Sequence, residues 1–328
     1  MHFDLLLALT AFGIGIVVGL TGMGGGALMT PALVLLFGIH PLAAVSSDLV
    51  ASAVMKPVGS LVHLRRGTVS TPLVRWLCVG SVPAAFAGVL LARSLGDGED
   101  VQHVIQVALG VALLTAAAGL VVRGCLQLAR RAARARAGEA GGPDAEEDAP
   151  VHVRRAATVL VGAVGGLVVG MTSVGSGSLI IIALMGLYPA LGANRLVGTD
   201  LVQAVPLVLS AALGHLFFGD FQLDVTTALL VGSVPGVWVG ARLSSRAPGG
   251  VIRPALAFVL LASALKLLGV STPGTGLILA AALVVAPLGW LAIRRRYEIT
   301  AAPARTPATG AEAGARTRAG ADRSELLA

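Results

Sequence analysis

Seven apolar runs along the chain are each long enough to cross a lipid bilayer, since a hydrocarbon layer of about 30 Å needs about 20 helical residues. The runs lie at residues 41–64, 72–93, 103–123, 196–218, 225–243, 251–270 and 274–293. Of all residues 55% are hydrophobic and only 12% are charged, against about a quarter charged in a soluble domain. We therefore predict an all-α polytopic membrane protein in a lipid bilayer. A soluble globule, a disordered protein and a nucleic-acid-binding protein are excluded.

Two further apolar segments, 4–38 and 156–190, are interrupted by glycine. The interruptions are Gly22-Met23-Gly24-Gly25-Gly26 and Gly175-Ser176-Gly177. We expect each segment to form two helical arms joined by non-helical backbone. The second arms, near 27–38 and 178–189, reach only about 18 Å as helices and are too short to span.

The two halves of the chain resemble each other in a nearly constant register. The matches pair 16–21 with 167–172, 48–50 with 200–202, and 79–83 with 231–235. One residue is inserted after the second glycine motif. The chain is therefore predicted to contain a duplicated unit of about 120 residues.

Arginine-rich loops predict the orientation of the spans, because such loops stay cytoplasmic. Arg65 and Arg66 follow the run at 41–64, arginines flank the linker at 124–155, and Arg294 to Arg296 follow the last run. The N-terminus is then outside, and the linker and the C-terminus are cytoplasmic. Each repeat becomes a glycine-tipped hairpin plus three spans, so the two repeats have opposite orientation. Inverted repeats with broken helices are typical of secondary transporters.

These patterns divide the chain into four parts. Residues 1–123 form the first membrane repeat, 124–155 a cytoplasmic charged linker, 156–296 the second repeat with a C-terminal helix, and 297–328 a disordered tail. We expect the linker and the tail to be flexible because they are polar, charged and rich in glycine and proline.

The glycine motifs resemble those of a known family. Gly-Leu-Thr-Gly-Met-Gly-Gly-Gly-Ala-Leu-Met-Thr-Pro at 19–31 resembles the signature of the TauE/SafE family of membrane anion transporters, also called the toluene-sulfonate uptake permease family. The segments 172–179 and 196–201 are similar to its second copy, and the resemblance covers nearly all of 5–293. It implies transport of sulfite, sulfate or an organosulfonate, two inverted repeats, and a homodimer as one form of the protein.

The sequence departs from the family pattern in two places. Ser176 replaces the middle glycine of the second motif. Asp48 and Asp200 stand where many relatives have a hydroxyl or a small residue. Both departures bear on the substrate more than on the fold.

The predicted substrate site lies at the glycine tips. Glycine lets a ligand approach the backbone closely, and helices that begin near Ala27 and Ser178 would offer free N–H groups to an anion. The candidate substrate-binding residues are Thr21, Gly22, Gly24, Gly25, Gly26, Lys56, Thr172, Ser173, Gly175, Ser176, Gly177 and Ser178. The alternative is that the glycines only allow tight helix packing.

Asp48, Asp200 and Gln203 are candidates for coupling or gating, because a carboxylate inside a span is costly and marks function. The two aspartates relay protons, bind a cation, or accept hydrogen bonds from the glycine-tip amides. Lys56 lies two turns from Asp48 and has Val208 as its repeat partner. It either contacts substrate or forms a salt bridge with Asp48. For His63 and His215, interfacial packing is favoured over proton transfer.

A secondary transporter for a small oxyanion is the leading hypothesis. A cation-coupled or cation-specific carrier is the alternative that the paired aspartates favour. An intramembrane serine protease using Ser176 or Ser178 is the weakest reading, because no Gly-x-Ser-Gly motif occurs. No enzymatic activity, metal or cofactor is expected.

The topology gives the first testable prediction. In a variant without Cys78 and Cys125, single cysteines placed between Glu139 and Pro150 should resist a membrane-impermeant thiol reagent in intact cells, whereas cysteines at 97–100 should react. The physical reason is the alternation of arginine-rich and arginine-free loops. Labelling of the linker from outside would contradict the inverted repeats.

Overall fold

The computed structural model describes residues 4–21, 25–65, 67–94, 98–137, 152–175, 177–189, 191–218, 221–243 and 249–296. These residues form helices and no strand, which confirms the all-α class. The helices are α1 (Leu5–Thr21), α2 (Gly26–Phe37), α3 (Pro41–Arg65), α4 (Thr71–Ser94), α5 (Glu99–Ala137), α6 (Arg155–Thr172), α7 (Leu179–Leu187), α8 (Ala193–Phe218), α9 (Leu223–Leu243), α10 (Gly249–Leu267) and α11 (Thr272–Arg296).

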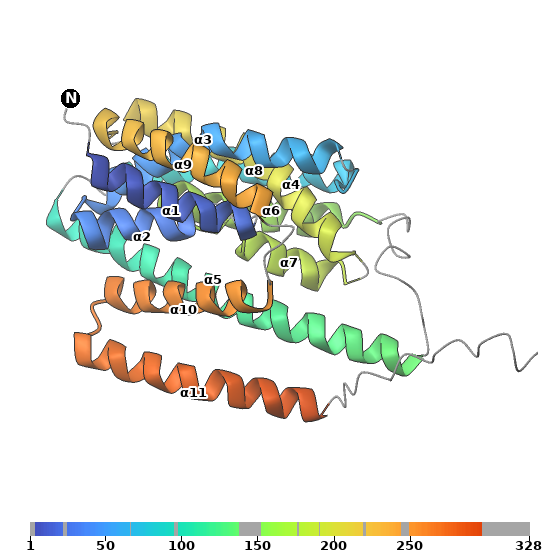
Figure 1. Ribbon diagram of the computed structural model, residues 1–328. Helices are drawn as coiled ribbons and strands as arrows, with labels where there is room; N and C mark the ends of the chain where they lie inside the picture. The colour runs from blue at the N-terminus through green and yellow to red at the C-terminus, as the bar shows by residue number, and fades with distance from the viewer. Residues whose placement is uncertain are drawn as a thin grey trace, which may run out of the picture. The chain divides into compact units, whose positions relative to one another are not determined.

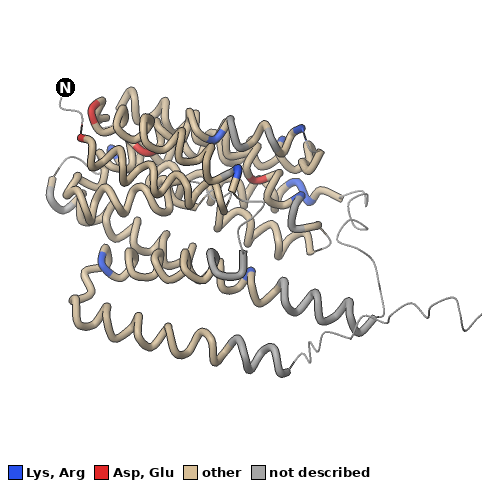
Figure 2. Tube along the Cα trace, in the orientation of Figure 1, with Lys and Arg blue, Asp and Glu red and all other residues tan. Residues whose placement is uncertain are grey.

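Six helices in the described part of the chain are long and apolar enough to cross a membrane. They are Thr71–Ser94, Val101–Leu126, Arg155–Thr172, Arg195–Phe218, Leu223–Gly240 and Thr272–Gly289. Charged residues are sparse along the described helices (Figure 2). α3 is long enough to span but carries Asp48, Lys56 and several serines, so it is the most polar of the predicted spans. The protein is a multi-pass membrane protein.

Both glycine-interrupted segments are broken helices. The first break lies between α1 and α2, and the second break lies between α6 and α7. α1 and α6 are about 26 and 27 Å long, whereas α2 and α7 reach only about 18 and 14 Å. The second arms are therefore too short to span, as predicted from their length.

The first arm of each repeat packs along the fourth helix of the other repeat. α1 lies along α9, and α6 lies along α4. The glycines of α9 face α1 carbonyls in rising order: Gly232 faces Ala8, Gly236 faces Phe12 and Gly240 faces Ile16. A side chain at these glycines would overlap the neighbouring backbone. The two helices are thus parallel and in close contact, as small residues allow in membranes.

The α4–α6 pair repeats this arrangement. Gly166 of α6 approaches the carbonyl of Ser81. Its repeat equivalent Gly15 approaches the carbonyl of Ser233, whose oxygen would lie 2.7 Å from a Cβ placed on Gly15. Gly80 against Val159 corresponds in the same way to Gly232 against Ala8. The contacts between the halves are therefore preserved when the two repeats are exchanged.

Equivalent helices of the two repeats run in opposite directions where they meet. α5 and α10 lie side by side (Figure 1), and Gln106 near the start of α5 donates from Nε2 to the carbonyl of Leu267 at the end of α10, at 3.1 Å. Ser46 near the start of α3 likewise meets His215 near the end of α8. The opposite membrane orientation of the repeats stays a prediction, because it also depends on which loops face each aqueous side.

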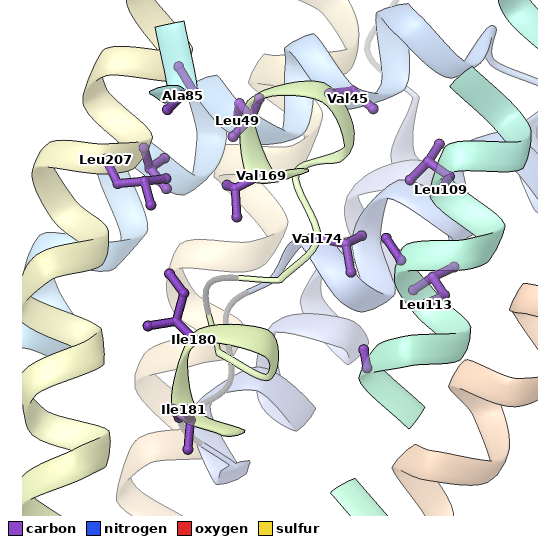
Figure 3. Packing of buried hydrophobic residues seen from close by; sticks show 14 of the residues in the cluster. Val45, Leu49, Ala85, Leu109, Leu113, Val169, Val174, Ile180, Ile181 and Leu207 are labelled. Carbon is purple, nitrogen blue, oxygen red and sulfur yellow. The ribbon is translucent and has the colours of Figure 1, made fainter. Parts of the chain in front are cut away.

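Buried apolar side chains form two clusters with α3 between them. Ala51 and Met55 of α3 pack in the smaller cluster with α1, α2 and α9, whereas Val45 and Leu49 pack in the larger one. Figure 3 shows the larger cluster, with Val174 of the second break directed toward α5. α3 therefore carries its polar residues between two apolar surfaces.

The predicted linker differs from expectation at its start. α5 continues to Ala137, so residues 124–137 are helical. This stretch is rich in Ala, Leu, Gln and Arg, which are strong helix formers despite the charge. Residues 138–151 of the linker predicted at 124–155, and the tail at 297–328, lie outside the described residues. The chain forms two compact units, Met1–Ala286 and Pro287–Ala328, and the boundaries of the two repeats stay a prediction.

The glycine contacts give a stability prediction. Gly15→Leu should destabilise the detergent-purified protein by about 1–3 kcal/mol, the usual cost of overpacking, because its Cβ would lie 2.7 Å from the Ser233 carbonyl oxygen. Gly13→Leu on the same helix is the matched control, since Gly13 is exposed and has nothing within 4 Å. Thermal unfolding measures both variants, and equal melting temperatures would contradict the close α1–α9 contact.

Candidate functional site

The two helix breaks meet. Gly26, the first residue of α2, lies so close to Ser173 that a Cβ at Gly26 would overlap the carbonyl and hydroxyl oxygens of Ser173. Ser173 is the residue that follows α6. The structure thus brings together the two motifs that the sequence places 147 residues apart, counted from Gly26 to Ser173. Gly22, Gly24 and Ser176 lie outside the described residues.

Asp48 of α3 forms hydrogen bonds at this contact between the two helix breaks. Its Oδ2 accepts hydrogen bonds from the hydroxyl of Ser173 at 2.6 Å and from that of Thr30 in α2 at 2.9 Å. The Asp48 side chain is fully buried, and its Oδ1 has no hydrogen-bond partner. We call these three residues the Asp48 cluster. It joins α2 and α3 of the first repeat to the second break.

The second break depends on two unusual backbone conformations. Ser173 has φ of 58°, in the left-handed region, and its N–H donates to the carbonyl of Val169 at 2.7 Å to end α6. A non-glycine residue there costs about 1–2 kcal/mol, which the hydrogen bond to Asp48 helps to offset. Gly175 has φ of 124°, a conformation open to glycine.

The start of α2 faces α3. A Cβ at Gly25 would lie 3.6 Å from Met55 Cε and 3.9 Å from the hydroxyl oxygen of Ser52, which is ordinary contact distance. The Ser52 hydroxyl is buried and has no hydrogen-bond partner. The amides of Gly26 and Ala27 lie in the first turn of α2, where the helix itself offers no acceptor. N–H groups and a free hydroxyl therefore meet beside Gly25.

Lys56 lies one turn beyond Ser52 on α3 and is 8% exposed. It interacts electrostatically with both Asp200 and Asp48, and more strongly with Asp200. Asp200 of α8 is buried and also lies within electrostatic range of Arg123 of α5. Gln203, one turn along α8, accepts a hydrogen bond from the hydroxyl of Ser81 at 3.1 Å. One face of α3 thus carries three polar residues spaced four apart, which we call the polar stripe: Asp48, Ser52 and Lys56.

The remaining predicted residues are placed differently. Thr21 and Thr172 donate their hydroxyls to carbonyls of their own helices, those of Val17 and Val168. Ser178 is buried at the start of α7, and Gly177 beside it is half-buried. Among the described hydrogen bonds, none joins Ser178 to the first break. The site predicted from both tips is therefore best formed on the side of Gly25, Gly26 and Ser173.

His215 is buried and joins both repeats, unlike the interfacial packing expected from its place near a span end. Its Nε2 lies 2.9 Å from the Gly170 carbonyl oxygen, so Nε2 carries the proton, because a carbonyl only accepts. Its Nδ1 lies 2.8 Å from the Ser46 hydroxyl. His215 thus holds α3, α6 and α8 together.

Sequence reasoning also missed Thr30, Ser52 and Ser81 as site residues. The only signal for Ser52 is its position one helical turn from both Asp48 and Lys56, since residues four apart share a face. Thr30 and Ser81 are single hydroxyls in apolar segments, and only the fold shows that they face Asp48 and Gln203.

The sequence of this chain is similar to those of known membrane transporters. The family described as "Sulfite exporter TauE/SafE" matches residues 7–267. The chain is similar to the "Probable membrane transporter protein YjnA" of Bacillus subtilis (strain 168), with 37% identity over 256 residues, 78% of this chain and 96% of that protein. It is 26% identical over 258 residues to the "Probable membrane transporter protein YdhB" of the same organism, covering 77% of this chain and 95% of that protein.

No solved structure matches this chain. The family match covers most of the chain and includes both glycine motifs, both buried aspartates and Lys56. The broken helices, the glycine contacts and the polar stripe all lie within it. The chain therefore belongs to the TauE/SafE family of membrane transporters.

Proposed function

We propose that this protein is a secondary transporter for a small oxyanion, with sulfite, sulfate or an organosulfonate as the substrate class. The description of the family as a sulfite exporter supports the class of anion. The single observation that carries the proposal is the contact of Gly25, at the start of α2, with the unpartnered Ser52 hydroxyl of α3, one turn from the buried Lys56.

These groups suit an oxyanion. The first turn of α2 offers N–H donors and the positive end of a helix dipole, and Ser52 offers a hydroxyl donor. Lys56 supplies a full positive charge on the same face of α3. Without a side chain at Gly25, an oxygen atom of the anion can approach the backbone at the start of α2 more closely than a Cβ would allow.

The surrounding charges limit how tightly the anion is held. Lys56 is shared with Asp48 and Asp200, so an anion competes with two carboxylates for one ammonium group. A transporter needs such competition, because a buried anion held by an unshared cation would be released slowly. The carboxylates are thus part of the release mechanism in this proposal.

We further propose that the protein lies in the cell membrane with its N-terminus outside and its linker and C-terminus in the cytoplasm. The arginine-rich loops support this orientation. The protein is proposed to move its substrate without covalent chemistry, in keeping with the transporter names of its relatives. Two copies are proposed to form a homodimer, as the family resemblance implies.

Removal of the Lys56 charge tests the anion site. Lys56→Met should weaken sulfite or sulfate binding about tenfold or more, because a hydrogen bond to a charged group contributes about 1.5–3 kcal/mol. Lys266→Met is the matched control, since Lys266 is exposed and donates to Thr272 at 2.7 Å. Binding to purified protein and flux into proteoliposomes measure the effect. Wild-type affinity in Lys56→Met would move the anion site elsewhere.

A methyl group at Gly25 gives an independent test. Gly25→Ala should keep the thermal stability of the wild type, because its Cβ fits at 3.6 Å from Met55 Cε, yet it should reduce anion affinity by filling the site. Gly26→Ala should instead lower stability, because its Cβ would overlap Ser173. Unchanged anion affinity in Gly25→Ala would leave the glycine run with a packing role only.

A further inference from the structure

The two oxygen atoms of the Asp48 carboxylate differ in their hydrogen bonds. Oδ2 accepts two hydroxyl hydrogen bonds, from Ser173 and Thr30, whereas Oδ1 is buried with no hydrogen-bond partner. A buried carboxylate oxygen without a partner is costly. A cation or a proton at Oδ1 would reduce this cost.

The described protein groups do not supply a dedicated charge. Lys56 is the charged group that interacts with Asp48, and it interacts more strongly with Asp200. Asp200 has Arg123 as a second cation within electrostatic range, although its Oδ1 is likewise buried without a hydrogen-bond partner. The groups that hydrogen-bond to Asp48 from α2 and from the second break are hydroxyls. Among the described residues, fewer cations therefore lie within electrostatic range of Asp48 than of Asp200.

The oxygens around Asp48 suit a small hard cation. Thr30 and Ser173 donate their protons to Oδ2, so the lone pairs of both hydroxyl oxygens stay available as ligands. α6 ends at Thr172, immediately before Ser173, and the negative end of its dipole adds to the field of the carboxylate. Cation sites of secondary transporters use such half-helix ends.

We propose that Asp48, Thr30 and Ser173 bind a sodium ion. The ligands are Asp48 Oδ1 and the hydroxyl oxygens of Thr30 and Ser173. One carboxylate matches one monovalent charge. Carboxylate and hydroxyl oxygens are ligands that hard cations prefer.

A proton fits this geometry less well than sodium. A proton on Oδ1 would be a buried donor with no described acceptor, and a proton on Oδ2 would face the two hydroxyls that already donate there. Either position leaves one hydrogen-bonding group unsatisfied, which is unfavourable in a buried site. A sodium ion at Oδ1 leaves both existing hydrogen bonds intact.

The site gives sodium a role in transport, a consequence that rests on the proposed function. Its ligands come from α2, α3 and the second break, so sodium stabilises the conformation in which Gly26 meets Ser173. That conformation also holds the start of α2 beside Ser52, one turn from Lys56 on α3. A bound sodium ion offsets the charge of an entering oxyanion and favours the anion-binding conformation.

Thermal unfolding of the purified full chain without oxyanion tests the site. Melting temperature is measured in NaCl, KCl and choline chloride at equal ionic strength and at several pH values. We expect a saturable stabilisation by sodium alone in the wild type and in Asp224→Asn, whose exposed carboxylate lies at the start of α9. Asp48→Asn should lose this stabilisation.

Two milder variants keep the test decisive if Asp48→Asn does not fold. Thr30→Val and Ser173→Ala retain the carboxylate and should each weaken the apparent sodium affinity about 10–100-fold, the range for a lost supporting group at a metal site. Equal stability in sodium and potassium would overturn the proposal. So would a sodium effect that persists in Asp48→Asn, or stabilisation by low pH in place of sodium.

Flux separates this inference from the proposed function. Oxyanion uptake into proteoliposomes is measured with and without a sodium gradient. Sodium stabilisation without oxyanion flux would overturn the proposed function and leave the sodium site standing. Oxyanion flux with no response to sodium, in protein or in vesicles, would overturn the sodium site alone.

Discussion

The meeting of Gly26 with Ser173 is the contact on which the rest of the site depends. A helix break inside a membrane exposes backbone groups that lipid cannot satisfy, so irregular backbone survives there only where protein covers it. Each break in this fold is placed where the other repeat can cover it. Asp48 completes the junction by holding Ser173 and Thr30 on one oxygen. The junction therefore stabilises the fold and holds the start of α2 against Ser52 and Met55 of α3.

The first arm of each broken hairpin packs against a helix of the other repeat, and this packing brings the two breaks together. α1 lies along α9 and α6 along α4, so each broken hairpin is held by the opposite repeat. Glycine at the contact points, such as Gly166 against Ser81, brings the backbones close without interlocking side chains. Without a hydrophobic driving force between helices in lipid, this close packing carries the association of the two halves.

The sequence predicts the helices well and the site only in part. Apolar run lengths and glycine interruptions predict the existence and order of α1 to α11, because span length and helix breaking are local properties. The helix at 124–137 was missed because its charge suggested a flexible linker. The roles of Thr30 and His215 depend on partners far along the chain, Asp48 and Gly170, which no local pattern indicates.

The two repeats have diverged at the positions that matter for chemistry. Lys56 corresponds to Val208, so one ammonium group serves two equivalent aspartates. Ser173 corresponds to Gly22, which has no hydroxyl, so Asp200 lacks the equivalent of the bond that Ser173 donates to Asp48. A symmetric duplication would give two identical half-sites. Here the shared scaffold supports one carboxylate that accepts two hydroxyl hydrogen bonds and one that lies within electrostatic range of two cations. In the proposed mechanism this difference lets a single duplicated fold bind a cation and an oxyanion.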